Sequence, residues 1–157
     1  MERNPSKTPK GVNKGNATVY STLFSGEEGL APLYTRSKLH QHADFAVLKQ
    51  QGLLPPNIDA QILVIGPGDG RDIHYLILAG YTNIVAVERD PQAVKKLLPK
   101  YGHKVHIVNQ DIMGYNQPDT FQFVFWMWCG ISDFSEEEQQ VMIDKVMTFL
   151  SPGGVAL

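Results

Sequence analysis

Cysteine, long apolar runs and an excess of one charge are what this sequence lacks. Of its 157 residues only Cys129 is a cysteine, so no disulfide framework can form within the chain, and a reducing, cytoplasmic setting is predicted. No apolar run approaches the roughly 20 residues of a membrane span, and the amino terminus lacks the apolar stretch of a secretory signal. The formal net charge of −2 gives no general attraction to nucleic acid or to an anionic membrane, so neither partner is expected.

Metal-binding spacings are also missing. The sequence contains no H-E-x-x-H pattern and no cysteine cluster, so no metal is expected. Cys129 has no sequence-local base to activate it and is interpreted as a buried residue. The histidines, which we interpret as structural or surface residues, are His40, His42, His74, His103 and His106.

The composition is that of a globular domain, with 43% hydrophobic and 19% charged residues. Residues 1–16 are polar and lack periodicity, which predicts a flexible tail. Residues 17–60 predict a helical extension, in which Tyr20 and Tyr34 are either lid residues or packing tyrosines. One helix in it is predicted to open at Ser37 and to end near Gly52. Its expected apolar face is Leu39, Ala43, Ala46 and Val47.

Residues 61–157 alternate between apolar strands and amphipathic helices. Strands are predicted at 62–65, 84–87, 105–108 and 121–126, and a fifth opens at 155–157. Helices are predicted at about 71–79, from Pro91 onwards, and at 135–150, where Ser135 and Glu138 form a capping box. This repetition favours an α/β fold with a doubly wound, mostly parallel sheet, whose ligands bind at the carboxyl ends of the strands.

A glycine-rich turn follows the first predicted strand. It consists of Gly66, Pro67, Gly68, Asp69 and Gly70. Glycines permit positive φ and let a ligand approach the backbone, and the amides that open the following helix attract anions. A dinucleotide fingerprint would need its third glycine at position 71, which is Arg71. A plain structural turn is the alternative interpretation.

An acidic residue ends the second predicted strand. Glu88 lies 88 − 66 = 22 residues after Gly66, close to the roughly 20 expected for a carboxylate that binds a ribose. Both carboxylate oxygens can accept hydrogen bonds from ribose hydroxyls. A solvated or salt-bridged glutamate is the alternative.

Residues 61–157 resemble the core of the class I S-adenosylmethionine-dependent methyltransferases, and the G-x-G-x-G turn and Glu88 carry the resemblance. It implies a Rossmann-like fold, S-adenosyl-L-methionine as cofactor and methyl transfer to an acceptor, which we expect to be a small molecule. The turn, Glu88 and the adjacent Arg89 would bind the cofactor. Asp111 would bond the adenine amino group and Ile112 would pack on the ring; a loop-capping role is the alternative for Asp111.

The segment after the fourth strand supplies further candidates. Trp126 and Trp128 would line the cofactor or substrate site, with core packing as the alternative. Asp133 is the nearest carboxylate and the one candidate catalytic residue, although a place in the turn before the helix is the alternative. The first strand and its turn also depart from the family pattern. Many members of the family carry a carboxylate where this chain has Val64, and Pro67 has no amide proton to donate to a ligand.

Two features of the resemblance limit what it implies. The family sheet has seven strands, and this chain stops at the start of the fifth, which suggests truncation and an edge where a second copy could pair. A non-catalytic cofactor-binding or scaffold protein therefore stays open. An aminopropyltransferase and a nicotinamide-using enzyme on the same fold also stay open. The chain lacks the paired-aspartate segment of the aminopropyltransferases, and Arg71 takes the place of the third glycine of a dinucleotide site, so each alternative has one feature against it.

Overall fold

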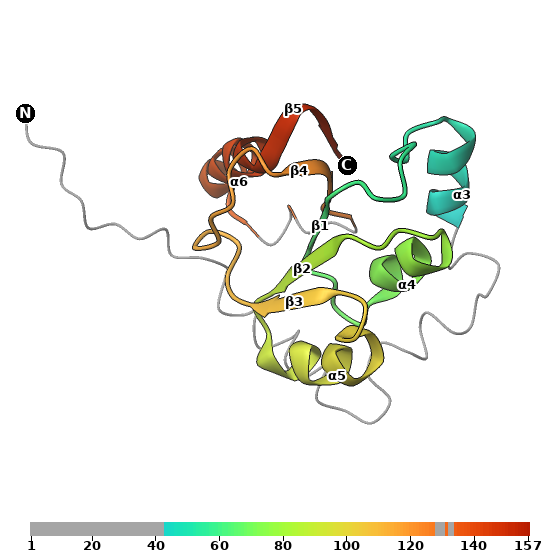
Figure 1. Ribbon diagram of the computed structural model, residues 1–157. Helices are drawn as coiled ribbons and strands as arrows, with labels where there is room; N and C mark the ends of the chain where they lie inside the picture. The colour runs from blue at the N-terminus through green and yellow to red at the C-terminus, as the bar shows by residue number, and fades with distance from the viewer. Residues whose placement is uncertain (1–42, 128–130, 132–133) are drawn as a thin grey trace, which may run out of the picture.

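The computed structural model in Figure 1 describes residues 43–127, 131 and 134–157. Its centre is a five-stranded sheet with helices packed against it. The strands are β1 (Ile62–Ile65), β2 (Ile84–Glu88), β3 (His106–Asn109), β4 (Phe121–Phe125) and β5 (Leu150–Ala156). The helices are α3 (Ala43–Gln50), α4 (Arg71–Leu78), α5 (Pro91–Tyr101) and α6 (Glu136–Phe149).

The sheet is parallel throughout and its strand order is β3-β2-β1-β4-β5. The chain moves outward from β1 to β3, then returns to the other side of β1 with β4. The order therefore reverses between β1 and β4, which is where open parallel sheets bind ligands. The predicted doubly wound α/β fold is confirmed, and among the described residues β3 and β5 are the outermost strands.

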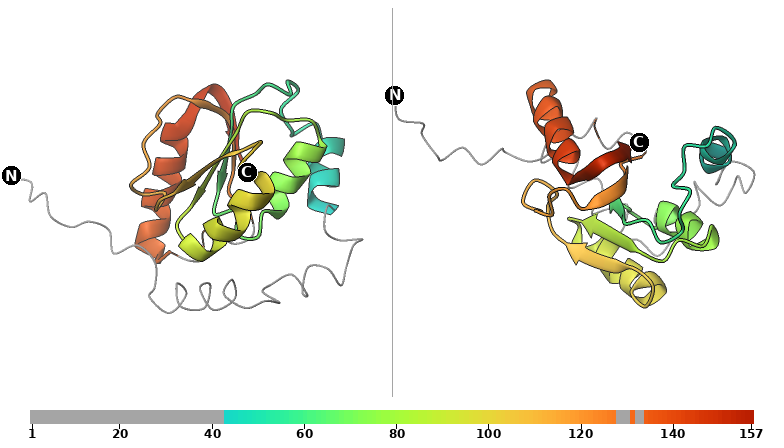
Figure 2. Two further views of the ribbon diagram at one scale, coloured as in Figure 1. Left: turned by 60° about the horizontal axis from the view of Figure 1, so that its bottom comes forward. Right: turned by 45° about the horizontal axis from the view of Figure 1, so that its top comes forward.

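Helices cover both faces of the sheet, as Figure 2 shows. Helices α4 and α5 lie on one face and α6 on the other. All four residues of β1 are buried because they alternate between two cores: Ile62 and Val64 belong to one, and Leu63 and Ile65 to the other. This burial on both faces explains the uninterrupted apolar run of the first strand.

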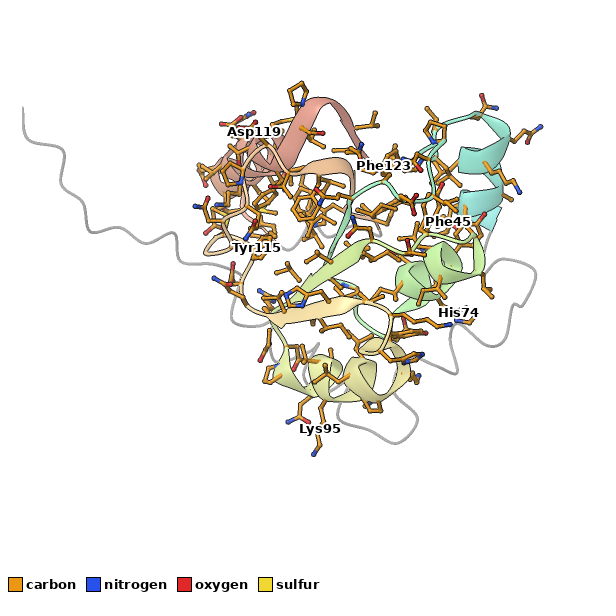
Figure 3. The ribbon with its side chains drawn as sticks, in the orientation of Figure 1. Phe45, His74, Lys95, Tyr115, Asp119 and Phe123 are labelled. Carbon is orange, nitrogen blue, oxygen red and sulfur yellow. The ribbon has the colours of Figure 1, made fainter. Side chains whose placement is uncertain are left out.

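The two cores differ in composition. The core beneath α4 and α5 contains Phe45 and Phe123, and the core beneath α6 contains Tyr115; Figure 3 labels these three residues. The ring centroid of Tyr115 lies 5.8 Å from that of Phe149 in the same core. Helix α6 buries Met142, Val146 and Phe149, and the predicted capping box at its start is present. This capping satisfies two backbone N–H groups that the helix itself leaves unpaired.

Strand β4 contains an irregularity that the alternation of its phenylalanines did not predict. The N–H groups of Gln122 and Phe123 both donate to the carbonyl of Gln61, at 3.0 and 3.2 Å. The extra residue rotates the strand, so Phe121 packs in the α6 core while Phe123 packs in the opposite one.

Strand β5 begins five residues earlier than predicted. It follows α6 directly and pairs Leu150 with Phe121, then Val155 with Phe123. Between these pairs β5 uses more residues than β4, and the surplus is Pro152-Gly153-Gly154, where Gly153 has a φ of 79°. These three residues therefore form an irregularity within the strand, and the predicted strand start at 155 was wrong.

The predicted apolar face of the helix before β1 was also wrong. Within α3, Val47 is 54% exposed and Ala46 is exposed, whereas Phe45 is fully buried. Phe45 stacks on Tyr75 of α4 with ring centroids 3.9 Å apart and packs against Phe125 at 5.6 Å. These tertiary contacts outweigh the weak helical periodicity in choosing the buried side. The predicted tail, Tyr20, Tyr34 and the start of this helix lie outside the described residues.

None of the helices in the described part of the chain is long and apolar enough to cross a membrane.

Phe45 and Val47, two residues of α3, give a matched test of this packing. We expect Phe45→Ala to lower the free energy of unfolding by about 3–5 kcal/mol, because it removes a buried ring from the core. Val47→Ala should change it by less than about 0.5 kcal/mol, since this side chain lies largely in solvent. Urea denaturation of both variants measures the difference, and equal losses would contradict the observed orientation of α3.

Candidate functional site

The glycine turn that follows β1 has an unusual backbone. All three of its glycines have positive φ: 60° at Gly66, 56° at Gly68 and 88° at Gly70. The Gly66 N–H donates to the carbonyl of Val87 in β2 at 2.9 Å, and the Gly70 N–H donates to the carbonyl of Pro67 at 2.9 Å. The turn is thus closed on itself and tied to the neighbouring strand in a conformation that glycine adopts without strain.

The first and third glycines are needed for different reasons. A Cβ atom added at Gly66 would meet nothing within 4 Å. One added at Gly70 would lie 2.4 Å from Cε2 of Tyr101 and 2.7 Å from Cδ2 of Leu97, both on α5. Gly70 therefore allows close packing of α5, whereas Gly66 leaves the backbone open to approach.

Glu88 lies at the carboxyl end of β2, buried with 6% exposure. Its Oε2 accepts from the Gly68 N–H at 3.1 Å and its Oε1 from the Asp90 N–H at 2.9 Å. The carboxylate therefore bridges the glycine turn and the start of α5. Burial raises the pKa of Glu88 above its ordinary 4.5, although the two amides favour the charged form.

Asn109, a residue that the sequence analysis did not single out, holds this strand end in place. Its Nδ2 donates to the carbonyls of Glu88 at 2.9 Å and Arg89 at 3.1 Å, and the Gln110 N–H also donates to the Glu88 carbonyl, at 3.0 Å. Asparagine at the last position of a strand beside an acidic strand end is the only sequence signal for this role, and it is a weak one.

Asp111 opens the turn that follows β3. Its Oδ1 accepts from the Met113 N–H at 2.8 Å, and its carbonyl accepts from the Gly114 N–H at 3.0 Å. The loop-capping role is therefore present, and among the described residues it engages only Oδ1 of the carboxylate. The neighbouring Ile112 is buried in the α6 core.

The amino terminus of α4 is already supplied with negative charge. The Asp69 Oδ1 accepts from the Arg71 N–H at 3.3 Å, and Asp72 lies buried in the first turn of the helix. Burial raises the pKa of Asp72, while the neighbouring Arg71 lowers it. The expected attraction of an anion to this helix end is thus offset by two aspartates of the chain itself.

No contact among the described residues joins the candidates that follow β4 to the glycine turn. Trp126 is half-buried against the α6 core, with its ring centroid 6.0 Å from that of Phe134, and its backbone N–H donates to the carbonyl of Leu157. Trp128, Cys129 and Asp133 lie outside the described residues. Within the described ranges, no group of histidine, cysteine and carboxylate side chains is arranged to hold a metal ion.

The fold is similar to that of several solved methyltransferases. The chain aligns over 96% of its length with the structure described as the DhpI–SAM–HEP complex, at a TM-score of 0.68 and 16% identity. It aligns over 99% of its length with 1,6-didemethyltoxoflavin-N1-methyltransferase from Burkholderia thailandensis, at a TM-score of 0.66 and 19% identity. It aligns over 88% of its length with the N-methyltransferase NodS from Bradyrhizobium japonicum, at a TM-score of 0.69 and 14% identity.

This chain spans about two thirds of the length of these structures: 66%, 65% and 69% respectively. A search of the curated proteins found no match. The sequence model of the methyltransferase domain family, however, matches residues 62–154, which run from the first residue of β1 into β5. Because this match covers more than half of the sequence, the chain belongs to the methyltransferase domain family.

Proposed function

We propose that this protein binds S-adenosyl-L-methionine across the carboxyl ends of β1, β2 and β3 and transfers its methyl group to a small-molecule acceptor. The observation that carries the proposal is the buried carboxylate of Glu88. Each of its oxygens accepts one backbone N–H and keeps a lone pair that can accept a further hydrogen bond. Two such acceptors side by side suit the two neighbouring hydroxyls of a ribose.

The surrounding residues fit the rest of the nucleoside. The open backbone at Gly66 lets a ligand approach the turn, and Pro67 is buried and shapes the turn without donating a hydrogen bond. We assign the adenine amino group to Oδ2 of Asp111, because Oδ1 is engaged in the turn. Ile112 would support the ring, and Arg89 would flank the site from the end of β2.

Charge favours a sulfonium nucleoside over a dinucleotide. Asp69 and Asp72 offset the positive end of α4, so a pyrophosphate placed there would meet two carboxylates. The cation of Arg71 is directed to Asp44 and Asp72. S-adenosyl-L-methionine carries a sulfonium and an ammonium group against one carboxylate, so its net positive charge suits these surroundings and supports it as the cofactor.

The sulfonium of the cofactor supplies a methyl carbon that is already activated for displacement. What remains for this chain is to orient the nucleoside through Glu88 and the turn, align an acceptor and exclude water. A dedicated base is optional, and Asp133 is the candidate for that role. Trp126 and Trp128 are proposed to line the acceptor side of the site.

The class of acceptor is supported by comparison rather than by contacts. The Burkholderia enzyme was solved with 1,6-didemethyltoxoflavin, a small molecule, and S-adenosylhomocysteine. The formal net charge of −2 also gives no general attraction to nucleic acid.

The single cysteine supports a cytoplasmic location. Pairing of a second copy along the β5 edge is a further proposal, supported by the place of β5 at the end of the strand order.

Glu88→Ala tests the ribose contact. We expect it to weaken the binding of S-adenosylhomocysteine by at least about 1.5 kcal/mol, roughly tenfold in Kd, because hydrogen bonds to a charged acceptor are lost. Isothermal titration calorimetry measures the change, and Glu136→Ala on the exposed start of α6 is the matched control. Thermal unfolding checks that both variants are folded. Binding of NADH in place of S-adenosylhomocysteine by the unaltered protein would overturn the proposal.

The raised pKa of Glu88 predicts how binding depends on pH. The charged carboxylate accepts from two amides and two hydroxyls, whereas protonation removes an acceptor. The Kd for S-adenosylhomocysteine should therefore fall as pH rises from just above 4.5, the ordinary value, towards neutrality. The contribution of Glu88 to the free energy of unfolding should decrease as pH rises over this range, because the folded state holds the proton more tightly than the unfolded state.

Glu88→Gln is the control for this pH dependence, since it has no titrating group at the position. It should bind more weakly, and its residual affinity should show no change across the same pH range. An equally steep pH dependence in this variant would assign the titration to another group and contradict the role of Glu88.

The two glycines with different surroundings give a separate test. Gly66→Ala should cost about 1–2 kcal/mol of stability from the left-handed backbone alone. It should also weaken S-adenosylhomocysteine binding, because the methyl group occupies the space that we assign to the ligand. Gly70→Ala should cost more stability, because its methyl overlaps Tyr101 and Leu97 as well. Urea denaturation and calorimetry compare them, and equal stability losses would contradict the packing role of Gly70.

A further inference from the structure

One side chain connects the glycine turn to the helix that precedes the sheet. Arg71 is the first residue of α4 and follows Gly70 directly. Its Nε donates to Oδ1 of Asp72 at 2.8 Å, and its Nη1 lies 2.9 Å from Oδ2 of Asp44 on α3. The Arg71 side chain is 10% exposed and that of Asp44 28%, so this ion pair is shielded from solvent more than a surface pair is.

The residue next to Asp44 contacts the same arginine. The guanidinium carbon of Arg71 lies 5.8 Å from the ring centroid of Phe45, and Phe45 stacks on Tyr75 one turn further along α4. Two consecutive residues of α3 therefore meet the first two turns of α4, one through charge and one through aromatic packing. Figure 1 shows α3 beside α4, and Figure 3 labels Phe45 where the two helices meet.

The backbone of Arg71 belongs to the glycine turn. Its N–H donates to Oδ1 of Asp69, the residue between the second and third glycines. One residue thus holds the turn through its main chain and α3 through its side chain. Any shift of α3 that pulls on the guanidinium acts on the position at which the turn becomes a helix.

We propose that Arg71 is a positioning residue, which through Asp44 fixes α3 against the cofactor turn and so couples the placement of α3 to cofactor affinity. The inference rests on the proposed function, since it assumes that the turn binds S-adenosyl-L-methionine. Arg71 itself touches neither the reacting atoms nor the cofactor in this account. Its contribution is to hold the turn in the conformation that accepts the ligand.

Coupling of this kind is reciprocal. If the Asp44–Arg71 contact stabilises the binding conformation of the turn, the bound ligand must stabilise the contact by the same factor. Ligand binding should then protect the backbone amides of α3 from hydrogen exchange. A residue with a purely structural role would lower stability when changed but would not link ligand binding to protection in α3.

Asp44→Asn isolates the link, because it removes the charge that meets Arg71 while keeping the shape of the side chain and the Arg71–Asp72 pair. The control is Asp144→Asn, the same change on an exposed position of α6 across the sheet. Asp44→Glu is the rescue variant, since it restores the charge. Each protein is studied by calorimetry with S-adenosylhomocysteine and by hydrogen exchange with and without it.

We expect S-adenosylhomocysteine to slow exchange in α3 of the unaltered protein. In Asp44→Asn the Kd should rise about fivefold, the lower end of typical coupling, and the added protection of α3 should be lost. Asp144→Asn should behave as the unaltered protein does, and Asp44→Glu should recover part of both effects.

Two results would overturn the inference alone. One is tight binding of S-adenosylhomocysteine to the unaltered protein with no change of exchange in α3. The other is an Asp44→Asn variant that keeps both the affinity and the protection. If the unaltered protein binds no S-adenosylhomocysteine, the proposed function and this inference fall together, so the two failures are distinguishable.

Discussion

The buried carboxylate of Glu88 is the interaction on which the strand ends depend. Removing a charge from water is costly unless the charge is hydrogen-bonded, and here two backbone amides from separate loops meet it. They fix the glycine turn after β1 relative to the start of α5. Because the pKa of Glu88 is nevertheless raised, burial outweighs the two bonds. Hydroxyl groups that donate to the same oxygens would complete the compensation, which is the role that we propose for the ribose of the cofactor.

The sequence predicted the features that depend on neighbouring residues. A tight glycine turn does follow the buried first strand, and Ser135 and Glu138 cap α6. Each of these follows from the local chemistry of a turn or helix end. The parallel sheet followed from the repetition of such units. The place of Glu88 could be predicted for the same reason, as it required only a strand end and a spacing.

Features decided by distant parts of the chain could not be predicted. The burial of Phe45 in place of Val47 depends on Tyr75 and Phe125, which lie in other elements. The extra residue at Gln122 depends on the carbonyl of Gln61 in the neighbouring segment. The bonds of Asn109 to the end of β2 arise only once β3 pairs with it. In each case short-range periodicity offered several outcomes, and tertiary contacts selected one.

The charges around the turn give its glycines a steric role rather than an electrostatic one. Loops that bind phosphate combine glycines with the uncompensated amides of a helix start. Here Asp69 accepts from the first N–H of α4 and Asp72 is buried within its first turn, so negative charge already faces that helix end. Arg71 does not reverse this, because its guanidinium is directed to Asp44 and Asp72. On the proposed function, the open backbone at Gly66 makes room for the ligand and the acidic residues favour one that carries positive charge, as a sulfonium nucleoside does.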